Sequence, residues 1–183
     1  MPQAHLSGAV AESPRRSRGG TPASRHSLDK LLSELQYALD EHFFDYRHSG
    51  RPIALGRLKL GVELLCKLED QLLLPALRAS RDADWPEIDK ALEEVEMLRD
   101  LTTLLDRTLA EQQYTLVPAI EGVAQLHFAS MGELLADADT EAVPWGRLEG
   151  DMREQLAAWH AEVSESGELE DDEDEDPVGE PPR

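Results

Sequence analysis

The chain has 183 residues, of which 40% are hydrophobic, and a formal net charge of −20. This length allows one domain with a hydrophobic core, and the acidic balance argues against nucleic-acid binding through phosphates, which needs clustered Lys and Arg. Residues 1–27 hold four arginines and one glutamate, whereas residues 165–183 hold ten acidic residues and one arginine. We therefore expect a disordered tail at 1–27, a helical domain at 28–164 and an acidic disordered tail at 165–183.

Cysteine content and hydropathy indicate the compartment. Cys66 is the only cysteine, so the chain can form no internal disulfide, and a reducing environment fits it best. A buried, unreactive thiol is the expected state of this residue. No apolar run reaches the roughly 18 residues that a membrane-spanning helix needs, and the N-terminus does not resemble a secretory signal. We expect a cytoplasmic protein without membrane contact.

Two amphipathic helices open the predicted domain. Ser27 is a suitable N-cap for the first helix, which we expect to run to about Arg47. Gly50 and Pro52 then mark a break. The second helix is expected over Ile53–Ala79.

An acidic residue lies on the apolar stripe of this second helix. Glu69 falls at helical spacing with five apolar residues, Leu58, Val62, Leu65, Leu72 and Ala76. A carboxylate in that position is costly unless it is paired, hydrogen-bonded or bound to a metal. Pro75 should kink or end the helix close to its C-terminus. The segment Leu72–Leu77 is apolar almost all round, so it should be buried against neighbouring helices or a partner.

Three further helices follow. The pattern predicts a third helix from Pro86 to Leu116, which Pro118 ends, a fourth over 119–136 and a fifth over 145–163. β-branched residues are sparse, and no alternating run with hairpin turn chemistry is present. The fold class is therefore all-α, an antiparallel four-helix bundle with a possible fifth helix.

Four polar side chains fall on the apolar stripes of these helices: His42, Glu69, Gln112 and His127. Imidazole and carboxylate groups that point into a bundle core can bind a metal ion. His42, Glu69 and His127 are thus candidate ligands of a single mononuclear site. A buried hydrogen-bonded network, or side chains at the stripe edge that reach solvent, would explain the same pattern.

A short internal repeat links two of these positions. The segment 65–77 aligns with the segment 108–120, so that Glu69-Asp70 matches Gln112-Gln113 and Leu73-Leu-Pro-Ala-Leu matches Leu116-Val-Pro-Ala-Ile. Chance similarity between leucine-rich helices is the alternative explanation.

Glu69-Asp70 followed by Leu73-Leu-Pro-Ala-Leu resembles the hemerythrin-like family of cation-binding four-helix bundles. In that family a histidine lies four residues before the first acidic residue, and a second acidic residue with a histidine occurs on the third helix. Here Leu65 and Val95 stand at those histidine positions, and Thr108 and Gln112 replace the ligands in the repeat. The resemblance therefore implies a degenerate bundle that has lost most metal ligands. We expect such a bundle to bind no cofactor, or at most one iron or zinc ion.

The family's last ligand helix could instead be the predicted fifth helix. His160 and Glu165 would then be its ligand pair. Both registers remain open from the sequence.

We expect a non-catalytic protein, not an enzyme. Glu69 could act as a general base, but no second catalytic group can be assigned. The alternative is an all-α adaptor that binds a protein partner, or forms a homodimer, through the apolar face of Leu72–Leu77 and the acidic tail.

Overall fold

The computed structural model describes residues 22–81, 84–138 and 142–166. These residues are helical with short connections and contain no strand, so the all-α prediction is confirmed. Residues 22–27, which we assigned to the N-terminal tail, form the first turns of a helix. The rest of that tail and nearly all of the acidic tail lie outside the described residues.

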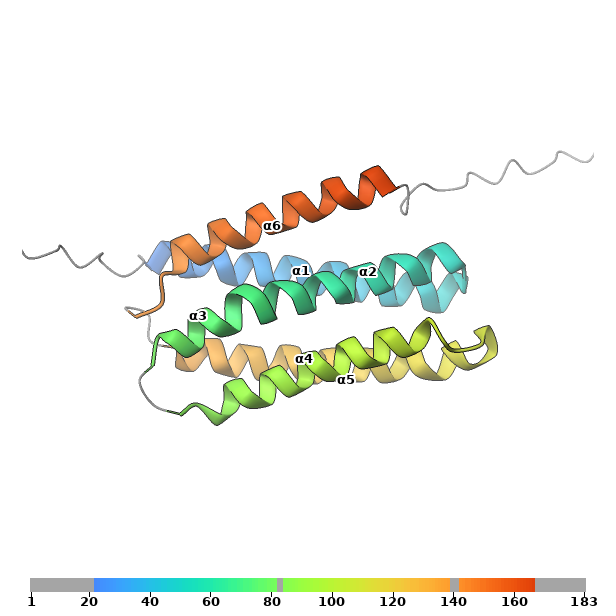
Figure 1. Cartoon of the computed structure of the whole chain (residues 1–183), viewed down its shortest axis with the longest axis horizontal. Helices are drawn as coiled ribbons and strands as arrows, with labels where there is room; N and C mark the ends of the chain where they lie inside the picture. The colour runs from blue at the N-terminus through green and yellow to red at the C-terminus, as the bar shows by residue number, and fades with distance from the viewer. Residues whose placement is uncertain (1–21, 82–83, 139–141, 167–183) are drawn as a thin grey trace, which may run out of the picture.

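Four helical segments pack around one core, and a fifth covers one side. The elements are α1 (Pro22–Ser49), α2 (Pro52–Leu68), η1 (Glu69–Leu73), α3 (Leu74–Ala79), α4 (Pro86–Leu105), α5 (Ala110–Asp137) and α6 (Trp145–Ser166). The α1/α2 hairpin packs on the α4/α5 hairpin, α2 next to α4 and α1 next to α5, while α6 lies along the outer face of α1 and α2 (Figure 1). This arrangement is consistent with a four-helix bundle that carries an additional helix.

The predicted break between the first two helices is confirmed. Gly50 adopts φ = 61°, and its N–H donates to the carbonyl of Tyr46 at 2.8 Å. Pro52 opens α2, where its missing N–H has no consequence. Ser27, however, is not an N-cap. It lies within α1, and its hydroxyl donates to Glu149 of α6 at 2.7 Å, which fastens the added helix to the bundle.

Pro75 neither ends nor sharply interrupts its helix, because the backbone widens ahead of it. Over Glu69–Leu73 the chain forms a π-helical turn, in which the N–H of Leu74 donates to the carbonyl of Glu69, five residues back. Proline has no N–H to offer Gln71, and in an α-helix its ring would crowd that carbonyl. The wide turn relieves this conflict and lets the helix continue to Ala79.

The predicted boundary at Pro118 is wrong. The helix that starts at Pro86 ends at Leu105, and α5 begins at Ala110 and runs through Pro118. At the real break, the N–H groups of Arg107 and Thr108 donate three residues back, which tightens the chain without Gly or Pro. Because Pro118 is exposed, its lost hydrogen bond leaves the carbonyl of Tyr114 near solvent.

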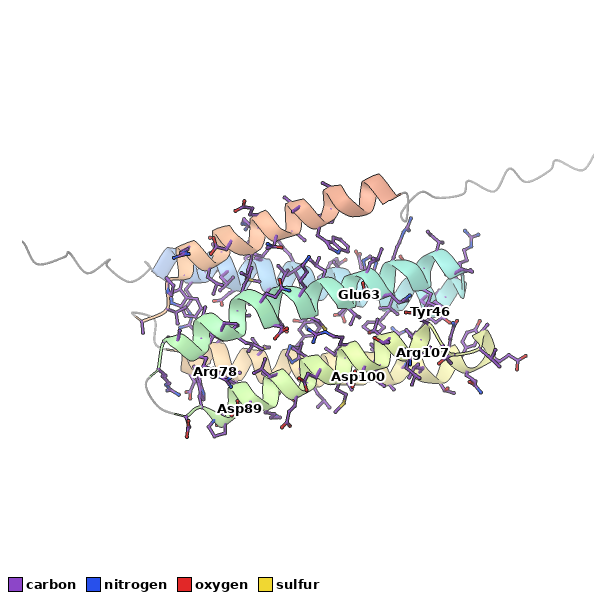
Figure 2. All side chains as sticks on the ribbon, viewed as in Figure 1. Tyr46, Glu63, Arg78, Asp89, Asp100 and Arg107 are labelled. Carbon is purple, nitrogen blue, oxygen red and sulfur yellow. The ribbon has the colours of Figure 1, made fainter. Side chains whose placement is uncertain are left out.

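The apolar segment at the end of the second helix buries three of its leucines inside the chain, whereas Leu72 and Ala76 are half-buried and Pro75 is exposed. Leu73, Leu74 and Leu77 are at most 1% exposed, and the segment packs against α4. At the same end, Arg78 of α3 forms an ion pair with Asp89 of α4 (Figure 2). A partner protein is therefore not needed to cover Leu73, Leu74 and Leu77, the most buried part of the segment on which the adaptor hypothesis partly rests.

Candidate functional site

Glu69 is held in the core by the π-helical turn. It is the first residue of η1 and is only 2% exposed, so the prediction that it faces the core is confirmed. A carboxylate at this depth loses most of its hydration and needs a compensating partner.

His127 of α5 supplies that partner. Its ring is fully buried, and Nε2 forms a hydrogen bond and ion pair with Oε2 of Glu69. The other ring nitrogen, Nδ1, lies 3.1 Å from Oε2 of Glu94 on α4. Glu69, His127 and Glu94 thus form a chain of three ionisable groups across three helices, which we call the Glu–His–Glu network.

The network continues from the core to the surface through Glu94, which is 14% exposed. The hydroxyl of Ser130 donates to Oε1 of Glu94 at 3.1 Å, and Nζ of Lys90 donates to the same hydroxyl at 3.2 Å. Lys90 also lies 3.6 Å from Glu94. A surface cation therefore balances the outer carboxylate, while the inner one depends on His127.

The pKa of His127 reflects these contacts. Burial of the ring lowers it, but the hydrogen bonds and charges of Glu69 and Glu94 outweigh burial and raise the pKa above the ordinary histidine value. A protonated ring donates from both nitrogens and satisfies both carboxylates at once. A neutral ring would donate to one and turn a lone pair toward the other.

His42, the third candidate ligand, is not part of this network. It is half-buried on α1 and packs against Gly61, about 12 Å of helix before Glu69. It lines a separate cavity between α1, α2 and α6, together with Trp159 and His160. Burial, aided by the charge of Arg57, lowers the pKa of His42 and favours a neutral ring.

The residues present do not fit a metal site of the kind the resemblance implies. The two nitrogens of His127 point in opposite directions, each toward a carboxylate, so the three groups do not converge on one point. Within the described ranges, no group of three or more His, Cys, Asp and Glu could hold a metal ion. The predicted set of His42, Glu69 and His127 is therefore not brought together.

The other two predicted positions stay apart as well. Gln112 is exposed in the first turn of α5, so its placement on an apolar stripe was wrong, and the error follows from the misplaced helix boundary. His160 stacks edge-on with Trp159, 5.1 Å between ring centroids, on α6. The side chain of Glu165, its expected ligand partner, lies outside the described residues.

Sequence reasoning missed Glu94. It adjoins Val95, the position compared with a family histidine, and it lies four residues before Leu98 on the same buried side of α4. Two features of the sequence could have identified Glu94 as a candidate: it lies beside the apolar stripe of α4, and it follows Lys90 by four residues, so the two side chains can pair. The pattern alone could not tell whether it faced solvent or His127.

Cys66 is buried, as expected. Its Sγ lies 3.7 Å from the carbonyl of Val95. Burial, with a contribution from the charge of Glu69, raises the thiol pKa to about 12. The thiolate that a nucleophile needs is therefore disfavoured.

A cavity adjoins the inner end of the network. It has a volume of about 300 Å³ and lies between α1 and α5, with Glu69 and Leu65 on its inner wall. Its apolar lining comes from Leu32, Leu65, Phe128, Met131 and Leu135, and its polar lining from Arg25, Asp29, Ser33 and Gln36. Below, we call it the α1/α5 cavity.

Comparison of the chain with protein-family models, curated proteins and solved structures found no match. In the parts of the chain that the structure describes, no helix has the length and apolar character needed to cross a membrane.

Proposed function

We propose that this protein is a non-catalytic helical bundle, related in design to hemerythrin-like domains, in which a hydrogen-bonded charge network replaces a metal centre. The observation that supports the proposal most directly is the position of His127 between two carboxylates. Both of its nitrogens are engaged. A metal ion at Nε2 would have to displace the bond to Glu69.

The proposal is tested by metal binding and by the state of the His127 ring. The full chain, titrated with Fe(II) and Zn(II), should bind neither stoichiometrically. In ¹⁵N spectra, both nitrogens of His127 should carry protons near pH 6 and should not shift when Zn(II) is added. One equivalent of tightly held iron or zinc, with loss of a proton from His127, would overturn it.

An all-α adaptor is the second candidate, and the exposed apolar side chains where α4 is followed by α5 favour it more than Leu72–Leu77 does. Leu104 near the end of α4, Leu109 just before α5 and Tyr114 in the second turn of α5 are 48%, 71% and 62% exposed. Large apolar side chains exposed this close together along the chain make this end of the bundle a candidate contact site.

Light scattering coupled to size exclusion tests self-association at this turn. A concentration-dependent dimer that Leu109→Ser abolishes supports the adaptor. A monomer at every concentration, with or without the substitution, argues against a homodimer.

A further inference from the structure

We infer that the α1/α5 cavity is a binding site for a small organic ammonium ion. Its volume of about 300 Å³ matches the lower end of small-molecule pockets. Such a pocket needs apolar walls and a few polar groups that select the charge of the ligand, and both are present here.

Glu69 selects a cation. It lines the cavity and is 98% withdrawn from solvent, and its hydrogen bond to His127 uses Oε2 alone. Among the described residues, no partner bonds Oε1. A ligand N–H⁺ group that reaches this oxygen would make a charge-assisted hydrogen bond in a poorly solvated place, where such bonds are strongest.

A second carboxylate stands on the α1 side of the same cavity. Asp29 is half-buried, and within the described part of the chain its side chain has no hydrogen bond or ion pair. The one cation of the lining, Arg25, is already engaged: its guanidinium donates to the carbonyl of Leu135 at 2.6 Å and lies 5.6 Å from the centre of the Trp145 ring. Arg25 keeps its charge in these contacts, so the lining carries two carboxylates against one cation, and the carboxylates are the groups that can accept from a ligand N–H.

The remaining wall favours a short hydrocarbon or aromatic body. Phe128 and Met131 of α5 and Leu32 of α1 line the cavity with apolar surface. An anion would meet two carboxylates, and a neutral hydroxyl would give Oε1 of Glu69 a hydrogen bond without the charge of an ammonium group. An arylalkyl ammonium ion satisfies the carboxylate and the apolar wall together.

Gly132 offers a way to close the cavity. It lines the cavity on the exposed side of α5, and a Cβ built on it meets no atom within 4 Å, so a side chain can start there at the cavity rim without a clash. Gly122 on the same helix is equally unobstructed but does not line the cavity. Gly132→Leu and Gly122→Leu are therefore a matched pair.

The full chain is titrated in EDTA with one of three probes: phenethylammonium, 2-phenylethanol or 3-phenylpropanoate. Binding is monitored by the NMR chemical shifts of the backbone amides. Phenethylammonium should saturate shifts at Gly132 and Ser33, and the neutral and anionic analogues should bind at least about tenfold more weakly. Glu69→Gln should weaken binding by a similar factor. Gly132→Leu should abolish binding, and Gly122→Leu should leave it unchanged.

Equal affinity for the alcohol, no saturable shift with the ammonium ion, or full binding by Gly132→Leu would overturn the inference. If Glu69→Gln does not fold, the glycine pair still decides. The inference rests on the proposed function, because Glu69 must be free of metal. A metal-free chain that ignores the ammonium ion defeats only this inference, whereas a chain loaded with one metal equivalent defeats the proposed function.

Discussion

Glu69 and His127 are hydrogen-bonded across the core although 58 residues separate them in the chain. The bond joins the π-helical turn to α5, and His127 passes the connection on to Glu94 of α4. The network therefore links the two hairpins of the bundle through charged groups in the midst of apolar packing.

Removing one member of this pair should destabilise the protein strongly. His127→Leu leaves Glu69 as an unpaired buried carboxylate and should lower the free energy of unfolding by about 3–5 kcal/mol. Glu69→Leu leaves His127 paired with Glu94 and should cost less. The double variant should be more stable than the sum of the two losses predicts, by about 1–3 kcal/mol. Urea denaturation of all four proteins measures this coupling.

The exposed pair of Arg99 and Asp70, 3.2 Å apart, provides the comparison. Its coupling should stay below about 1 kcal/mol, because solvent screens both groups. Equal coupling energies in the two double-mutant cycles, Glu69/His127 and Arg99/Asp70, would mean that the buried pair adds nothing beyond a surface ion pair.

Stability should fall as pH rises through the folded-state pKa of His127. Because that pKa is raised above the unfolded value, the folded state binds the proton more tightly. The contribution is complete below the unfolded pKa of about 6.5 and is lost above it, at up to about 1.4 kcal/mol per pH unit between the two pKa values. Denaturant unfolding at pH 6 and pH 9 measures the loss, and His127→Gln should lack it. The same slope in the variant would assign the effect to other groups.

Cys66 should resist thiol reagents in the folded protein. Its pKa of about 12 and its burial keep the thiolate scarce and inaccessible. Modification by an aromatic disulfide reagent should be negligible in native buffer and complete in concentrated guanidinium chloride. Fast native labelling would show that α2 opens locally next to Glu69.

Two glycines should respond in opposite directions to alanine. Gly50→Ala places a side chain at φ = 61°, with its Cβ 2.8 Å from the Tyr114 hydroxyl, and should destabilise by about 1–2 kcal/mol. Gly122→Ala in the middle of α5 meets open space and should stabilise by about 0.5–1 kcal/mol. Thermal unfolding of both variants tests this contrast, and a stable Gly50→Ala protein would contradict the turn geometry.

Pro118→Ala should stabilise the protein. The substitution restores an N–H that can donate to the carbonyl of Tyr114 within α5 and removes a residue with very low helix propensity, for a gain of about 1–3 kcal/mol. Hydrogen exchange at position 118 should show protection. A loss of stability would mean that the missing hydrogen bond at Pro118 costs this helix nothing.

The fold class could be predicted because apolar spacing reports directly on which side of a helix is buried. Leu58, Val62 and Leu65 lie in the core as that spacing predicted. The boundary between α4 and α5 could not be predicted in the same way. Pro118 is the strongest local stop signal, yet an exposed proline is tolerated in a helix that is packed along its length, and the real break has no signal residue.

The candidate site was half predictable for a related reason. Periodicity places Glu69 and His127 in the core, but it does not say which helices are neighbours. Only the packing of α4 beside α5 brings Glu94 to His127, and the position of Gly61 keeps His42 two turns away from Glu69. Which ionisable groups meet therefore depends on how the helices pack, and the apolar spacing along each helix does not report this.

The wide turn at Glu69–Leu73 also sets the register of the helix beyond it. It holds one residue more than an α-helical turn, and the orientation of every side chain beyond it depends on how that extra residue is accommodated. If the same residues formed an ordinary α-helical turn, the following helix would be rotated by about 100°. Either Leu77 would leave the core or Glu69 would leave His127. A one-residue deletion inside the turn removes the extra residue and keeps this register, whereas a one-residue deletion within α2 shifts it.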